Sequence, residues 1–327
     1  MQNESNHFNR REFARLAAAG AAALAWPLHS RAEQVEKQTF TYKKVDGVEI
    51  KADVYHAAAS GSRRPTVIWI HGGALILGSR AGVIARFHER LLAKGWPIVS
   101  IDYRLAPETK LPAILEDVED ACRWVREQGP KLFGADAERI AISGGSAGGY
   151  LTLSTGFRVN PKPQALVSFW RYGDVAGAWY SQPDPFYASQ PAVPKDEAYA
   201  AVGKQVLTGV EGKSDRGRFY LYCRQQGLWP REVTGHDPDR DPKAFDPFCP
   251  LRNVTRAYPP TLLIHGDRDT DVPYEQSVLM NRELARNDVE HELITVRGGG
   301  HGLAGVESGI ADEAYDRAVE FLAKHLS

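Results

Sequence analysis

The segment RIAISGGSAG, residues 139–148, carries the clearest fold signal in this chain. An apolar strand (139–143) runs into the pattern Gly-x-Ser-x-Gly, and a helical segment begins near Ala147. Glycines on both sides of Ser146 allow the strained turn that lifts a serine hydroxyl above the edge of a sheet. The N-terminus of the following helix points backbone N–H groups at any oxyanion formed there. The pattern predicts a nucleophilic serine; the alternative is a glycine-rich strand-to-helix turn with an incidental serine.

Short apolar segments alternate with helical stretches on both sides of this motif. Expected strands are 66–70, 97–101, 139–143, 165–169, 261–265 and 290–296, and helices are expected near 80–94, 112–128, 147–157, 274–286 and 309–325. A hairpin with alternating polar and apolar residues, 39–42 and 48–55, precedes them around the turn Asp46-Gly47. Continuous apolar strands between helices predict an α/β fold with a mostly parallel sheet covered on both faces.

Residues 171–250 interrupt this alternation. The segment is rich in Pro, Gly, Asp and aromatic residues and lacks a clear period. A long segment of this kind inside a domain predicts a cap or lid placed over the sheet. Most of its aromatic rings are expected to form a small core of their own, while a few line a substrate pocket.

Residues 1–32 have the order of an export signal: Arg10-Arg11-Glu12-Phe13, an alanine-rich run and Ser30-Arg31-Ala32. The paired arginines resemble a bacterial twin-arginine signal, which predicts a periplasmic or secreted protein whose mature domain is 33–327. The apolar run of about a dozen residues is shorter than the roughly 20 that span a bilayer, so no permanent membrane anchor is expected. The alternative is an amphipathic helix packed on the domain.

Composition excludes other classes of function. Forty basic and 41 acidic residues give a formal charge of −1, which provides no positive field for nucleic acid. The three cysteines (Cys122, Cys223 and Cys249) lack metal-ligand spacing, so no metal is predicted from them. Pairing of Cys223 with Cys249 stays open, as does the oligomeric state.

Two further motifs join the serine motif. His71-Gly72-Gly73-Ala74 follows the first apolar strand, and DYRLAPE occupies 102–108. Together with GGSAGG (144–149) they resemble the α/β-hydrolase superfamily, nearest to carboxylesterases like hormone-sensitive lipase, over residues 40–325 apart from 171–250. The resemblance implies an oxyanion hole made by backbone N–H groups of Gly73, Ala74 and Ala147. The family often has glycine where Ala74 stands; a methyl group is tolerable beside a backbone donor but narrows the acyl site.

The family order is nucleophile, acid, histidine. HGDRDTDVP (265–273) resembles the family's acid loop H-G-x-x-D-x-x-V-P, which places the acid at Asp269, with Asp271 and then Asp267 as competitors. His301, in GGGHG after the strand 290–296, is the expected base, because imidazole takes and returns protons near neutral pH. His291 lies inside a strand, and His325 lies on the last helix with an expected surface position. His71 and the block 102–108 are expected to be structural.

The sequence therefore predicts a serine hydrolase in which Ser146 attacks an ester, His301 moves the proton and Asp269 orients His301. Export and the aromatic insertion favour small acyl groups on carbohydrate, such as acetyl or feruloyl groups, as the substrate. No cofactor is required by this mechanism. The alternatives are a peptidase resembling prolyl oligopeptidase and a binding protein of the same fold without catalysis.

Overall fold

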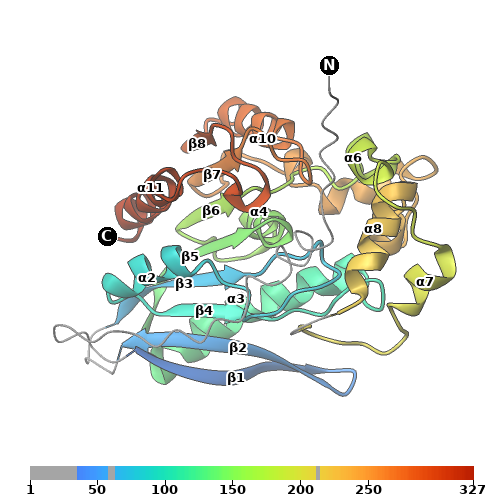
Figure 1. The fold of residues 1–327 in the computed structure, drawn as a ribbon. Helices are drawn as coiled ribbons and strands as arrows, with labels where there is room; N and C mark the ends of the chain where they lie inside the picture. The colour runs from blue at the N-terminus through green and yellow to red at the C-terminus, as the bar shows by residue number, and fades with distance from the viewer. Residues whose placement is uncertain (1–34, 58–62, 211–213) are drawn as a thin grey trace.

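The computed structural model describes residues 35–57, 63–210 and 214–327. Within these residues eight strands form one sheet in the order β1-β2-β4-β3-β5-β6-β7-β8 (Figure 1). The pairs β1–β2 and β2–β4 are antiparallel, and the other pairs are parallel. The strands are β1 (Val35–Val45), β2 (Val48–Ala57), β3 (Arg64–Ile70), β4 (Ile98–Ile101), β5 (Ala135–Gly145), β6 (Ala165–Phe169), β7 (Thr261–Gly266) and β8 (His291–Val296).

The predicted opening hairpin and parallel sheet are confirmed. β1 and β2 meet at Asp46 and Gly47, whose φ angles of 52° and 76° are those of a tight hairpin turn. β4, β6 and β7 are buried along their whole length, which explains why their sequences are apolar without alternation.

Helices cover both faces of the sheet (Figure 1). α2 (Ala85–Ala93) and α11 (Ser308–Leu326) share one apolar core with the sheet. α3 (Leu111–Leu132), α4 (Ala147–Arg158) and α10 (Glu275–Arg286) share the core on the other face. The fold is therefore the predicted three-layer α/β arrangement.

One helix begins later than the sequence predicts. α2 starts at Ala85 instead of near residue 80, because the preceding residues make contacts that a helix would break. The indole Nε1 of Trp69 donates to the carbonyl of Gly82 at 2.8 Å, and Arg80 Nη1 lies 2.6 Å from Asp102 Oδ2. These contacts hold the loop after β3 against the edge of the sheet.

The strand order reverses at β3, whose neighbours are β4 on one side and β5 on the other. In open parallel sheets the loops after the strands diverge at such a point, so their carboxyl ends leave room for a ligand. Ser146 follows β5 at this place.

The segment 171–250, called the cap segment below, contains short helices that lie beside the carboxyl edge of the sheet (Figure 1). They are α5 (Ala178–Ser181), α6 (Pro185–Ala188), α7 (Lys195–Ala200), α8 (Arg216–Gln226), α9 (Trp229–Thr234) and the 3-10 helix η1 (Pro242–Phe248). The aromatic rings pack together as predicted, but they are continuous with the core of the sheet instead of forming one of their own. Tyr180 stacks on Trp229 with ring centroids 4.0 Å apart, and Tyr172 packs edge-on against both and stacks on Tyr150 of α4. Phe186 departs from this packing, since 47% of this residue is exposed.

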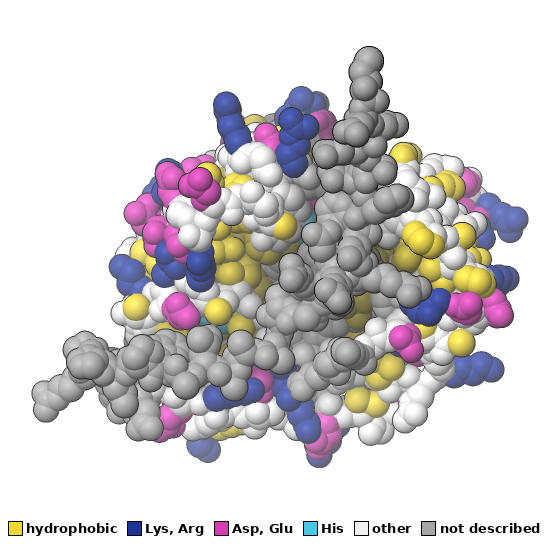
Figure 2. Space-filling model, in the orientation of Figure 1, with side chains coloured by type: hydrophobic (Ala, Val, Ile, Leu, Met, Phe, Trp, Pro, Cys, Tyr) yellow, Lys and Arg dark blue, Asp and Glu magenta, His cyan; other side chains and the backbone are white. Residues whose placement is uncertain are grey.

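Cys122, Cys223 and Cys249 are buried free thiols, so Cys223 and Cys249 do not pair. Among the described residues, no helix has both the length and the apolarity needed to cross a membrane. The same residues contain no group of three or more His, Cys, Asp or Glu side chains placed so that it could hold a metal ion. Basic and acidic side chains are interspersed around the face in Figure 2. The expected signal segment, 1–32, lies outside the described residues, so export stays a prediction.

Candidate active site

Ser146 lies on a strained turn between β5 and α4. Its φ of 58° and ψ of −123° are sparsely populated for a residue with a side chain. Its N–H donates to the carbonyl of Phe169 in β6 at 3.0 Å. At Gly148, an added Cβ would lie 2.0 Å from the carbonyl oxygen of Ile70, so only glycine allows α4 to approach β3 this closely. The turn thus places Ser146 at the carboxyl edge of the sheet.

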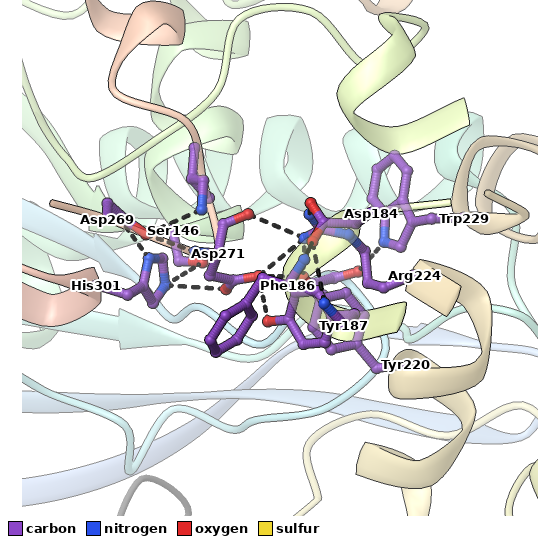
Figure 3. Close-up of polar contacts among 12 residues, drawn as sticks. Ser146, Asp184, Phe186, Tyr187, Tyr220, Arg224, Trp229, Asp269, Asp271 and His301 are labelled. Atoms are coloured by element: carbon purple, nitrogen blue, oxygen red, sulfur yellow. Dashed lines mark hydrogen bonds and ion pairs between the residues drawn. The ribbon is translucent and has the colours of Figure 1, made fainter. Parts of the chain in front are cut away.

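Three predicted residues meet at this edge (Figure 3). His301 opens the short 3-10 helix η3 (His301–Leu303) after β8, and Asp269 lies in the loop after β7. His301 Nε2 is 3.1 Å from Ser146 Oγ, and His301 Nδ1 is 2.8 Å from Asp269 Oδ2. Because a carboxylate only accepts, Nδ1 carries the proton and Nε2 is the acceptor for the serine hydroxyl.

The carboxylate of Asp269 is enclosed by donors. Oδ2 accepts from His301 and also from His265 Nε2 at 3.0 Å, while Oδ1 accepts from the N–H groups of Asp271 and Val272 at 2.8 and 2.9 Å. Burial alone disfavours the ionised form, but the hydrogen bonds from His265 and His301 hold the pKa of Asp269 well below its usual range. Asp269 is therefore ionised at neutral pH.

A second layer of polar contacts, absent from the sequence analysis, supports Asp269. Arg171 donates to Ser277 Oγ, and Ser277 is hydrogen-bonded to His265 Nδ1. Burial lowers the pKa of His265 and lowers that of Arg171 to about 9, so His265 is neutral and Arg171 is still charged at neutral pH. His265 had a signal in the sequence, since it opens the acid-loop motif, whereas Ser277 and Arg171 had none.

Asp271, the competing acid, lies on the other side of the imidazole. Its Oδ2 is 3.4 Å from His301 Nε2, the nitrogen that faces Ser146. Burial disfavours a charged His301, but the charge of Asp271 and the hydrogen bond to Asp269 outweigh it, so the pKa of His301 is raised above 6.5. Two carboxylates therefore flank one histidine, and Asp269 is the one bound to Nδ1.

The cap segment holds Asp271 through its other oxygen. Oδ1 accepts from Tyr187 Oη at 2.7 Å, Tyr220 Oη at 2.5 Å and Arg224 Nη1 at 2.9 Å. Arg224 is buried and its Nη2 donates to Asp184 Oδ2 at 2.6 Å, which links α8 to the start of α6 (Figure 3). Sequence reasoning missed this cluster because its members lie on short helices without periodicity.

The loop expected to form the oxyanion hole lies beside the serine. A Cβ on Gly72 would be 3.2 Å from Ser146 Cβ. Gly73 and Ala74 have φ angles of 106° and 55°. Within the described residues, no acceptor takes a hydrogen bond from the N–H groups of Gly73, Ala74 or Ala147. As far as the described part of the chain goes, these three donors are available to a ligand oxygen.

Two side chains fix this loop. Trp229 Nε1, from the cap segment, donates to the carbonyl of Ala74 at 3.0 Å. His71 Nδ1 lies 2.7 Å from the carbonyl oxygen of Gly72, and its ring stacks on Tyr103 at 4.2 Å. Alanine at a positive φ costs about 1 kcal/mol relative to glycine, so the backbone of Ala74 is strained. Its methyl group also occupies space that a glycine would leave open.

The other candidates lie away from Ser146. Asp267 accepts from the N–H of Gly298 at 2.7 Å and supports the loop that carries His301. His291 begins β8 and so lies at the amino ends of the strands, opposite the end that carries Ser146. His325 is half-buried near the end of α11, 3.4 Å from Glu290, so its expected surface position is wrong because the helix packs that side against the sheet.

The block 102–108 makes structural contacts. Asp102 accepts from the N–H and Nη1 of Arg80 at 2.7 and 2.6 Å. Glu108 receives two hydrogen bonds from Arg216 in α8, each 2.8 Å long. The block therefore ties the loops at the carboxyl edge to the cap segment.

Known proteins share this architecture. A family model described as the alpha/beta hydrolase fold matches residues 67–305. Esterase LipC of Mycobacterium tuberculosis is 33% identical over 250 residues, which are 73% of this chain and 53% of that protein. A non-reducing polyketide synthase of Aspergillus calidoustus is 29% identical over 348 residues, 89% of this chain and 14% of the synthase. The chain belongs to the alpha/beta hydrolase family, and it spans about half or less of the length of these curated relatives.

Solved structures agree in fold. A bacterial heroin esterase superimposes with a TM-score of 0.70 at 20% identity, over 97% of this chain and 91% of that one. Carboxyl esterase 2 of Tuber melanosporum gives a TM-score of 0.66 at 20% identity, over 97% and 98% of the two chains. At this level of identity the likeness concerns the fold.

Proposed function

We propose that this protein is a serine hydrolase that cleaves carboxylic esters through an acyl-enzyme. One observation carries the proposal: His301 joins Ser146 Oγ, at 3.1 Å, to the buried carboxylate of Asp269, at 2.8 Å. A nucleophile, a base and a group that orients the base are the parts that acyl transfer requires. The relationship to esterase LipC supports the same chemistry.

In the first half of the reaction, Ser146 Oγ attacks the ester carbonyl while His301 Nε2 takes the hydroxyl proton. Asp269 keeps the proton on Nδ1 and stabilises the imidazolium. The N–H groups of Gly73, Ala74 and Ala147 donate to the oxyanion. Collapse of the tetrahedral species breaks the bond to the alcohol oxygen, which leaves with the proton from Nε2.

In the second half, water attacks the acyl-enzyme and gives a proton to His301, and the acid is released as Ser146 recovers its proton. The acyl group we propose is short, such as acetyl, or feruloyl, carried on a carbohydrate. The methyl group of Ala74 favours a narrow acyl site, and the exposed ring of Phe186 in the cap segment suits a ring-bearing substrate.

The test is the rate of the purified protein on p-nitrophenyl esters from acetyl to decanoyl, with Ser146→Ala in parallel. Turnover that falls with acyl length and is lost in the variant supports the proposal, as does labelling of Ser146 by a fluorophosphonate. Full turnover by Ser146→Ala refutes it. A labelled serine without ester turnover points to a peptidase or a binding protein.

A further inference from the structure

Asp271 presents a carboxylate that the proposed mechanism does not use. The side chain of Asp269 is fully buried, but that of Asp271 is 20% exposed and so reachable by a substrate. Its Oδ2 is 3.4 Å from His301 Nε2, the atom that exchanges protons with the reacting groups. A charged acceptor thus lies beside the reaction centre.

The cap segment fixes this carboxylate in one orientation. Tyr187, Tyr220 and Arg224 all donate to Oδ1, and Arg224 Nη1 also donates to the main-chain oxygen of Asp271 at 2.9 Å. The guanidinium is itself held among aromatic rings, 4.6 Å from the centroid of Tyr187 and 4.9 Å from that of Tyr180. Oδ1 is therefore saturated, and Oδ2 is turned towards His301.

While His301 is neutral, Asp271 Oδ2 has no donor among the described residues. Nε2 accepts the hydroxyl of Ser146, so Nε2 carries no proton, and two acceptors face one another across 3.4 Å. Among the described residues, no side chain or N–H donates to Oδ2. A carboxylate oxygen without a hydrogen-bond donor binds a ligand that supplies one more favourably than a ligand that does not.

The leaving alcohol is the part of an ester that reaches this position. When the tetrahedral species collapses, Nε2 donates to the alcohol oxygen, which must therefore lie within hydrogen-bond distance of Nε2 and close to Oδ2. A hydroxyl on the carbon next to the one that bears the ester oxygen then reaches Asp271 Oδ2. The exposed ring of Phe186, 5.2 Å from that of Tyr187, offers apolar surface to the carbon skeleton (Figure 3).

We propose that Asp271 Oδ2 binds a free hydroxyl next to the scissile ester oxygen, so that the substrates are partly acylated polyols. The inference rests on the proposed serine hydrolase activity and names the alcohol side of its substrate. The carboxylate also disfavours esters whose alcohol part is anionic, because like charges meet without solvent between them. Asp271 is thus a specificity residue, and Asp269 remains the acid of the triad.

The experiment compares two butyrate esters that differ in one donor, a hydroxy ester (2-hydroxyethyl butyrate) and its methyl ether (2-methoxyethyl butyrate). The ratio of kcat/KM for the hydroxy ester to kcat/KM for the methyl ether is measured in the wild type and in Asp271→Asn. Because hydrogen bonds to charged groups are strong, we expect a wild-type ratio of about 10 or more. In Asp271→Asn the amide oxygen stays with Tyr187 and Tyr220, the amide nitrogen cannot accept, and the ratio falls to about 2 or less.

Asp184→Asn is the matched control. It removes the other carboxylate that binds Arg224 but leaves Asp271 in place, so we expect it to keep the wild-type ratio. Each ratio is measured within one variant, so a general loss of activity cancels.

Four results would overturn the inference. They are a wild-type ratio near 1, an unchanged ratio in Asp271→Asn, an equal loss in Asp184→Asn, and a stronger preference for protonated 2-(dimethylamino)ethyl butyrate, which would assign Oδ2 to a cationic alcohol. The first stands on the wild-type protein alone and is independent of how a variant folds. If both esters are hydrolysed equally, the proposed function survives; if neither is hydrolysed, both proposals fail.

Discussion

The variant Asp269→Asn distinguishes the roles of the two carboxylates that flank His301. In the structure four donors point at Asp269: His265 and His301 at Oδ2, and the N–H groups of Asp271 and Val272 at Oδ1. Asparagine offers one oxygen, so two of the four donors must face its NH₂ group. If the oxygen stays with the two N–H groups, His301 can no longer keep its proton on Nδ1.

The magnitude follows from that tautomer. With the proton on Nε2, the imidazole cannot accept the proton of Ser146, and loss of the correct tautomer lowers kcat by about 10⁴. This factor corresponds to about 5 kcal/mol of activation free energy. If the amide flips instead, two N–H groups lose their acceptor, at a cost of about 1–3 kcal/mol each in stability. Either orientation is damaging.

The assay is kcat on p-nitrophenyl butyrate at pH 8, with Asp271→Asn measured in parallel and the thermal unfolding of both variants recorded. We expect Asp269→Asn to lose at least about 100 times more activity than Asp271→Asn. Activity of Asp269→Asn within tenfold of the wild type would refute the assignment. A larger loss in Asp271→Asn would make Asp271 the triad acid.

Two further predictions concern pH and packing. The charges of Asp271 and Asp269 raise the pKa of His301, and only neutral His301 acts as the base, so kcat/KM falls as the pH drops through that pKa. Asp271→Asn removes one of these charges and therefore moves the acid limb to lower pH. A pH–rate profile of kcat/KM for both proteins measures the shift. An unmoved limb would contradict the stated role of Asp271. Gly148→Ala places a methyl against the carbonyl of Ile70 and lowers the free energy of unfolding by about 3 kcal/mol or more. Its control, Gly309→Ala, enters open space in α11 and changes stability by about 1 kcal/mol at most; equal results in chemical denaturation would show that the close approach is absent.

Much of the fold was predictable because its signals are local. The continuous apolar strands predict a parallel sheet, and the turn at Asp46-Gly47 predicts the first hairpin. The start of α2 and the helices of the cap segment were the exceptions. The contacts of Trp69 and Arg80 that delay α2 join separate parts of the chain, and the short cap helices lack a clear period.

Some residues of the candidate site were predictable from local motifs, and others were not. Ser146 and His301 stand in glycine-rich motifs whose spacing has a steric cause, so the sequence could single them out. The motif also favoured Asp269 over Asp271, but the two are separated by one residue. Only the distances to Nδ1 and Nε2 distinguish their places around the imidazole.

The amino-acid sequence therefore predicts the α/β class, the succession of strands and helices outside the cap segment, and the residues that serve as candidate nucleophile, acid and base. Periodicity and glycine sterics act over a few residues, so the strands, the helices and the turn at Ser146 are predictable locally, whereas Asp269 was placed by the resemblance of its loop to the family's acid loop. Tertiary packing was needed to bring Arg171, Ser277 and His265 into support of Asp269. It also places Tyr187 and Arg224 where they orient Asp271. Those contacts join side chains up to 106 positions apart, and their energy exists only once the loops at the carboxyl edge have packed together.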